Sequence, residues 1–198
     1  MNIGDILSSI NKFDLLVVLF LFGMFVLGFI QGTIRRILGL ASMLFAFLFA
    51  ANLRGPLGSY LAANWNDYPD EYAVMLGFAI VFVAATIAFT IVIQGFYHKQ
   101  SLFKKATWAD EIIGGLLGIV QGLFLIGFVT IILDSFFRIP TIPISAAEFP
   151  WLRSFWEAID SSTTGQIFRS TLIPGFVSVF GLLIPTDLQA FYVTVIPR

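Results

Sequence analysis

The sequence predicts an all-α integral membrane protein. We expect four transmembrane helices in two hairpins, followed by short amphipathic helices in the membrane interface. Of the 198 residues, 58% are hydrophobic and only 12% are charged, whereas roughly a quarter of the residues of a soluble domain are charged. The chain contains 23 phenylalanines, and its mean hydropathy is +0.92. Four apolar runs approach the length of about 20 residues that a membrane-spanning helix needs.

The four apolar runs contain no proline and no acidic or basic residue in their interior. They are residues 15–30, stretching to about residue 33, and residues 37–53, 72–97 and 112–133. A single helix over residues 15–53 would be roughly 58 Å long at 1.5 Å per residue, about twice the hydrocarbon thickness. We therefore expect a hairpin with its break at Gly32 and with Arg35 and Arg36 at the membrane surface. The alternative is a re-entrant loop of two half-membrane helices.

The loop charges predict the orientation. The loops after the first and third runs must lie on the same side, and together they contain five basic residues, Arg35, Arg36, Lys99, Lys104 and Lys105. The opposite side has three near the ends of the runs, Lys12, Arg54 and Arg138. Because basic residues favour the cytoplasmic side, we expect the odd-numbered loops in the cytoplasm and both termini on the opposite side of the membrane.

Small residues recur at four-residue spacing in the apolar runs. Gly114, Gly118 and Gly122 lie on one face of the fourth run, and Gly28 and Gly32 are spaced in the same way in the first. In lipid, small residues mark the faces on which helices approach closely. These stripes predict either packing within one chain or, as the alternative, an oligomer contact or a pore.

The region after the fourth run differs in character, and we predict a domain of residues 1–135 followed by a tail of residues 136–198. The stretch 151–162 has Trp151, Leu152, Phe155, Trp156 and Ile159 on one helical stripe, a pattern typical of a helix in the interface. Residues 172–185 are too short to cross, and we expect a second surface-lying or dipping helix there, with another short piece at 188–197. A soluble mini-core packed on the membrane domain is the rival interpretation.

Charged residues predict contacts at the ends of the runs. The hairpin topology places Asp110 and Glu111 on the same side as Arg35 and Arg36, where an ion-paired clamp could form. The carboxylates would also lie at a helix N-terminus, which favours negative charge. The alternative is four solvated charges. On the opposite side, Asp14 and Asp134 could each pair with Arg54 or Arg138.

The residue types predict neither catalysis nor a metal site. The chain has no cysteine and one histidine, His98. Ser101 follows His98, but no nucleophile motif surrounds the two residues, so a solvated loop histidine is favoured over a catalytic dyad. We expect no cofactor, and no small-molecule substrate is identifiable. The net charge of −1 argues against nucleic-acid binding, which needs a basic face.

The glycine motifs resemble those of a known family. Asp110 followed by the three glycines at 114, 118 and 122 is similar to the fourth-helix signature of the CvpA family, the colicin V production protein family. Asp14, Gly28, Gly32 and the Arg35–Arg36 pair resemble that family's start. The resemblance covers about residues 13–135. The chain departs from the pattern at Glu111 and Gln121, where the family often has basic residues.

The resemblance implies a small multi-pass inner-membrane protein linked to toxin production and export and to envelope homeostasis, with no established reaction. We therefore expect a scaffold or accessory subunit whose partners are membrane lipids and other membrane proteins or itself. The alternative is an oligomeric channel or transporter subunit built on the glycine faces; an intramembrane enzyme is a third, less favoured reading.

Overall fold

A computed structural model describes residues 11–65, 68–96, 107–139 and 148–193, which form helices and no strands. Four long helices come first, followed by shorter pieces. They are α2 (Lys12–Gln31), α3 (Thr33–Asn64), α4 (Asp70–Phe96), α5 (Thr107–Phe137), α6 (Pro150–Asp160), α7 (Thr163–Ile167), the π-helical turn η1 (Phe168–Leu172), α8 (Ile173–Phe180), the 3-10 turn η2 (Gly181–Leu183) and α9 (Thr186–Val193). His98, Ser101 and the three lysines of the predicted third loop lie outside the described residues.

Among the residues that the structure describes, five helical segments, rather than the four predicted, are long and apolar enough to cross a membrane by length and composition. The fifth is Thr163–Leu183, which runs through α7, η1, α8 and η2. The prediction that this region holds only a short surface-lying or dipping helix at residues 172–185 is therefore corrected. The side chain of Ser162 accepts a hydrogen bond from the backbone N–H of Gly165, so the helix begins a full nine residues earlier.

The second helix is also longer than predicted. The apolar run ends at Leu53, but α3 continues to Asn64 with Pro56 inside it. Helix α3 therefore contains Arg36 and Arg54, both of which are buried. The apolar run 37–53 itself contains no proline and no charge, but α3 extends beyond it at both ends, because hydrophobicity marks the apolar part of a helix and not its ends.

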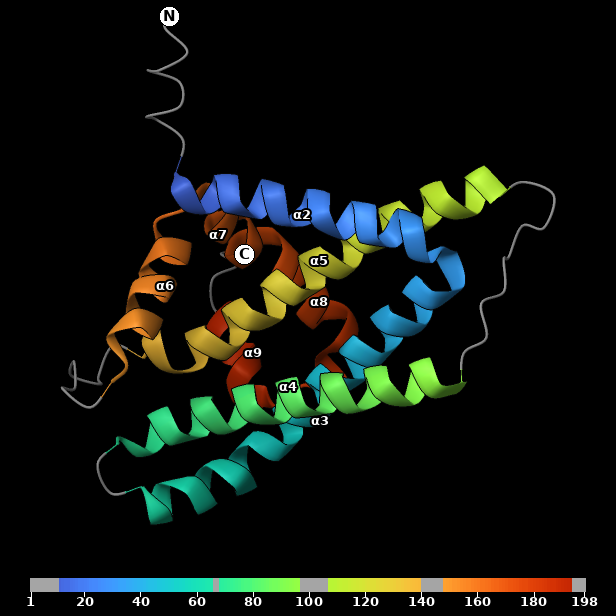
Figure 1. The fold of residues 1–198 in the computed structure, drawn as a ribbon. Coiled ribbons are helices and arrows are strands. Elements are labelled where there is room, and N and C mark those ends of the chain that lie inside the picture. The colour runs from blue at the N-terminus through green and yellow to red at the C-terminus, as the bar shows by residue number, and fades with distance from the viewer. Residues whose placement is uncertain (1–10, 66–67, 97–106, 140–147, 194–198) are drawn as a thin grey trace, which may run out of the picture.

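The long helices do not pair in chain order. The chain turns at the single residue Gly32, whose φ of 76° is in the left-handed region that glycine adopts readily. From this turn α2 and α3 diverge. Helix α2 packs along α5, and α3 packs along α4 (Figure 1). The two predicted hairpins of consecutive helices are thus replaced by one outer pair, α2 with α5, and one hairpin, α3 with α4.

The α2–α5 pair is held at backbone contact by glycine. A Cβ atom on Gly114 would lie 2.6 Å from the carbonyl oxygen of Gly28, and one on Gly118 would lie 2.1 Å from that of Met24. Since no side-chain carbon can approach backbone so closely, only glycine fits at these positions. The third rung, Gly122, faces the Leu21 side chain instead, with 2.9 Å between its Cβ position and Leu21 Cδ2.

An aromatic cluster joins the two helix pairs to the C-terminal segment. Phe47 of α3 and Phe128 of α5 stack with 3.9 Å between ring centroids. Phe176 of α8 packs edge-on against both, at 5.8 Å and 5.3 Å. Residues from the predicted tail therefore help to form the core between α3 and α5.

Replacing Gly118 by leucine is expected to force α2 and α5 apart, because the new Cβ meets the Met24 backbone and not a movable side chain. We expect a loss of about 3 kcal/mol or more in the free energy of unfolding, measured in detergent micelles. Gly23→Leu is the matched control, since a Cβ there has no atom within 4 Å. Equal stability of the two variants would contradict the close contact.

Candidate functional site

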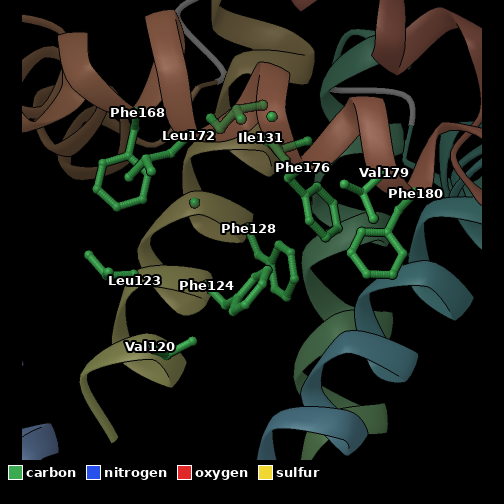
Figure 2. Close-up of a pocket in the computed structure, with 13 residues that line it drawn as sticks. Val120, Leu123, Phe124, Phe128, Ile131, Phe168, Leu172, Phe176, Val179 and Phe180 are labelled. Carbon is green, nitrogen blue, oxygen red and sulfur yellow. The ribbon is translucent and has the colours of Figure 1, made fainter. Parts of the chain in front are cut away.

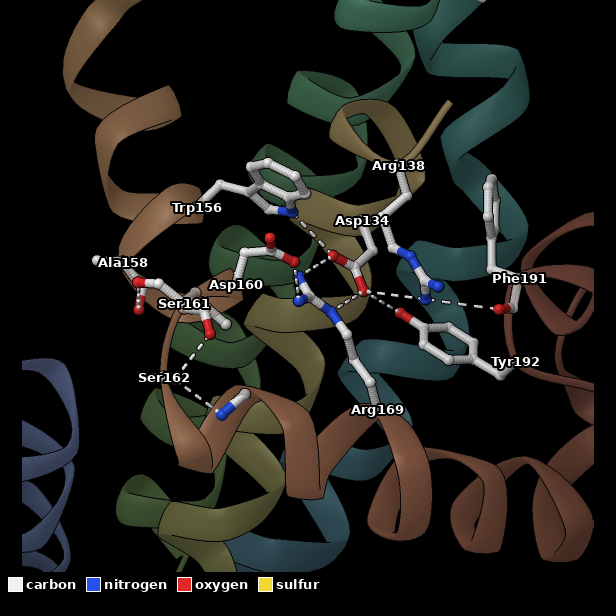
Figure 3. Close-up of polar contacts among 12 residues, drawn as sticks. Asp134, Arg138, Trp156, Ala158, Asp160, Ser161, Ser162, Arg169, Phe191 and Tyr192 are labelled. Carbon is white, nitrogen blue, oxygen red and sulfur yellow. Dashed lines mark hydrogen bonds and ion pairs between the residues drawn. The ribbon is translucent and has the colours of Figure 1, made fainter. Parts of the chain in front are cut away.

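The most extensive polar cluster in the described residues surrounds Asp134, which is completely buried in the last turns of α5. Its Oδ1 accepts hydrogen bonds from Trp156 Nε1 at 2.9 Å and from Arg169 Nη2 at 2.6 Å. Its Oδ2 accepts from Arg169 Nε and from the Tyr192 hydroxyl, both at 2.9 Å. Figure 3 shows the four donors converging on the carboxylate. Such a bidentate arginine–carboxylate pair is among the strong polar contacts.

Two further charged residues complete this cluster, which we call the Asp134 hub. Arg138 lies one turn beyond Asp134, with its Nη1 3.7 Å from Asp134 Oδ2. The same nitrogen donates to the Phe191 carbonyl at 3.5 Å. Asp160 forms a second ion pair with Arg169. The hub thus balances two carboxylates against two guanidinium groups, which offsets much of the cost of burying charge.

The hub determines where the C-terminal helices lie. Its members come from α5 and the residue just after it, and from α6, η1 and α9, which are far apart in the sequence. Two other polar contacts hold the same C-terminal helices in place. Asp14 at the start of α2 accepts hydrogen bonds from the backbone N–H groups of Thr163 and Thr164, at 3.2 and 2.9 Å. Arg54 of α3 pairs with Asp187 of α9.

These contacts correct the predicted pairings of the charges at this end of the molecule. Asp134 does contact Arg138, as predicted, but its main partner is Arg169, for which no pairing was predicted from the sequence. Asp14 caps α7 and does not pair with Arg54 or Arg138. A signal for Arg169 was present, since it is the only charged residue between positions 163 and 183, and a lone arginine in an apolar helix requires a partner.

A second polar cluster, the Arg36 seam, lies between α3 and α5 at the opposite end of the bundle. The Thr33 hydroxyl donates to the Asp110 carbonyl at 2.9 Å, and Arg36 Nη1 donates to Gln121 Oε1 at 2.7 Å. The Asp110 carboxylate lies against Gly32, with Oδ2 2.6 Å from the position of a Cβ atom there. One carboxylate therefore lies near the N-termini of both α3 and α5, where negative charge is stabilising.

The four residues of the predicted clamp are not joined by ion pairs. All four are described, and no ion pair links Arg35 or Arg36 to Asp110 or Glu111 among the described residues. The two helices are joined instead through Thr33 and Gln121. Arg36 Nε and Asp110 Oδ1 are buried without a hydrogen-bond partner. The Arg36 guanidinium and the Asp110 carboxylate therefore lie in the same part of the molecule but do not contact each other directly.

Within the described part of the chain, no group of three or more acidic, histidine or cysteine residues could hold a metal ion. The hydrogen-bond donors and acceptors around Asp134 are already paired with one another within the hub. Its geometry is that of a structural junction, because every lone-pair direction of Asp134 is used internally.

The fold and the two clusters define a small multi-helix membrane protein, stabilised by glycine contacts on one side and by a buried ionic junction on the other. The chain belongs to the Colicin V production protein family, whose family model matches residues 13–180. No curated protein and no solved structure matches the chain. The family match extends 45 residues beyond the expected limit of 135, and it includes Arg169 and most of the helical segment Thr163–Leu183.

Replacing Asp134 by asparagine is expected to lower the free energy of unfolding by about 3–5 kcal/mol, since it leaves the buried Arg169 without its bidentate partner. The matched control is Asp160→Asn, which removes a largely exposed carboxylate from the same arginine and should cost below about 1 kcal/mol. Chemical unfolding in detergent measures both. Similar losses in the two variants would show that Asp134 is not the centre of the junction.

The hub also predicts a dependence on pH. Burial, followed by the neighbouring Asp134, raises the pKa of the Tyr192 phenol well above its ordinary value. The neutral phenol therefore contributes stability fully below about pH 10, the unfolded pKa, and this contribution is lost as pH rises through the folded pKa. Between pH 9 and 12 the wild type should lose stability faster than Tyr192→Phe. Parallel unfolding curves over that range would contradict the assignment.

Proposed function

We propose that the protein is a non-catalytic scaffold or accessory subunit in the bacterial plasma membrane, acting in toxin production and export or in envelope maintenance. The observation that supports this proposal most is that the glycine faces pack against each other within one chain. Gly28, Gly114 and Gly118 are in backbone contact within a single chain. A channel assembled through these glycine faces would require α2 and α5 to separate. The pore alternative is therefore less favoured, because the faces proposed for its assembly already contact each other within one chain.

The outer faces of the helices are available to lipids and partners. Leu19 and Phe22 of α2 and Ile87 of α4 are exposed. On α4, Ala73 and Gly77 face the interior, whereas Ala84 and Ala88 are exposed beside Ile87. Small residues permit a close approach of another transmembrane helix, so we assign the partner contact to this part of α4.

The proposed orientation follows from the charges at the two ends. The Arg36 seam marks the end with the odd-numbered loops, which we place in the cytoplasm, in keeping with the excess of basic residues there. The Asp134 hub and the C-terminal helices then lie at the extracytoplasmic end. In this orientation the Asp134 hub lies on the extracytoplasmic side, where an exported molecule would leave the membrane.

Two measurements test the scaffold. Light scattering of the purified protein in detergent should give the mass of a single chain of 22.0 kDa. A photo-crosslinking residue at position 87 should give a defined adduct with a different membrane protein in native membranes, whereas one at position 22 of α2 serves as the control and should give lipid adducts. A stable homo-oligomer, or adducts at position 87 with the same chain only, would favour the channel.

A further inference from the structure

An apolar cavity of about 310 Å³ lies between α5 and the C-terminal helical segment. Leu123, Phe124 and Phe128 of α5 form one wall. Phe168 and Phe176 are among the residues of the opposite wall, which we call the roof because it lies across α5 in Figure 2. The volume falls in the range of ligand-binding pockets in proteins, which begins at about 300 Å³.

The lining determines what the cavity can hold. Every residue around it is aliphatic, aromatic or glycine. A buried water needs two to four polar partners, and no lining side chain offers one. A headgroup or a polar metabolite would likewise leave its hydrogen bonds unmade. The chemistry of the wall therefore selects a hydrocarbon.

The cavity continues an exposed stripe along α5. Ile112, Leu116 and Val120 follow one another every fourth residue and are 42%, 54% and 39% exposed. Leu123 and Phe124 continue the same face, but there the roof covers it. The stripe is thus an apolar track along α5. It ends at Val120, which lines the cavity and is itself exposed, and we call this edge of the cavity its mouth.

Polar contacts hold the roof near both of its ends. Arg169, adjacent to Phe168, is bound to Asp134. At the far end, Asn52 Nδ2 donates to the Leu183 carbonyl at 3.0 Å. These polar contacts keep the roof from collapsing onto α5.

We propose that this cavity binds the end of one acyl chain of a membrane phospholipid, from the leaflet at the N-terminal end of α5. The distance from Ile112 to Val120 is about 12 Å at 1.5 Å per residue, and half of the hydrocarbon core is about 15 Å. A chain lying along the stripe therefore brings its terminal carbons to the mouth. This lipid site goes beyond the proposed scaffold function and does not depend on it.

The test uses the full-length protein in vesicles of phosphatidylethanolamine and phosphatidylglycerol, with a diazirine near the methyl end of one acyl chain. After illumination, labelled residues are identified by mass spectrometry. We expect Leu123, Phe124 and Phe176 to be labelled at least fivefold more than the exposed face of α4 at Ile80 and Ile87. Labelling of the cavity at or below that of the α4 face would overturn the proposal.

A pair of glycine variants separates the cavity from the general lipid surface. Gly175 lines the cavity, and a Cβ atom on it has no atom within 4 Å, so Gly175→Leu adds a side chain at the cavity without a clash at its Cβ. It should lower labelling of the cavity at least fivefold, whereas Gly23→Leu on α2 should leave it unchanged. Unchanged labelling in the folded Gly175→Leu protein would exclude the cavity as the binding site. If that variant does not fold, Phe180→Trp fills the same space from the roof and is judged by the same criterion.

Discussion

Asp134 and Arg169 are opposite charges buried at the junction of α5 with the C-terminal helices. Neither could remain in this apolar region without the other, because an unpaired buried charge costs several kcal/mol. Their contact brings the segment Thr163–Leu183 across α5, and Trp156 and Tyr192 bring α6 and α9 to the same carboxylate. The roof of the apolar cavity and the position of Phe176 in the aromatic core both depend on this pair.

The opposite side of α5 is held by a different kind of force. Apolar side chains gain little by leaving lipid, so close backbone packing has to stabilise the contact of α2 with α5. The rungs Gly114 and Gly118 supply it. Helix α5 is therefore the axis of the molecule: glycine fixes α2 on one face, aromatic packing fixes α3 on another, and the hub fixes the C-terminal helices at its end.

The helical class, the break at Gly32 and an amphipathic helix after position 150 could be predicted, because hydrophobicity, spacing and glycine act locally. The pairing of the helices could not, because a stripe such as Gly114 to Gly122 marks a contact face without naming its partner. The hub was missed for a related reason. Arg169 was assigned to a tail of separate character, and only its isolation in an apolar stretch indicated that it must meet a buried carboxylate.

Gln121 illustrates how a residue can be understood only with its neighbour. At position 121 the resemblance to the family predicts a basic residue. Considered alone, Gln121 therefore represents the loss of a positive charge. The structure brings a positive charge to the same place from another helix, since Arg36 of α3 donates to the Gln121 amide. A second cation at position 121 would face Arg36 at hydrogen-bond distance in a poorly solvated site and repel it. The neutral amide instead accepts a hydrogen bond from the guanidinium group, so the departure at position 121 and the burial of Arg36 are consistent with each other.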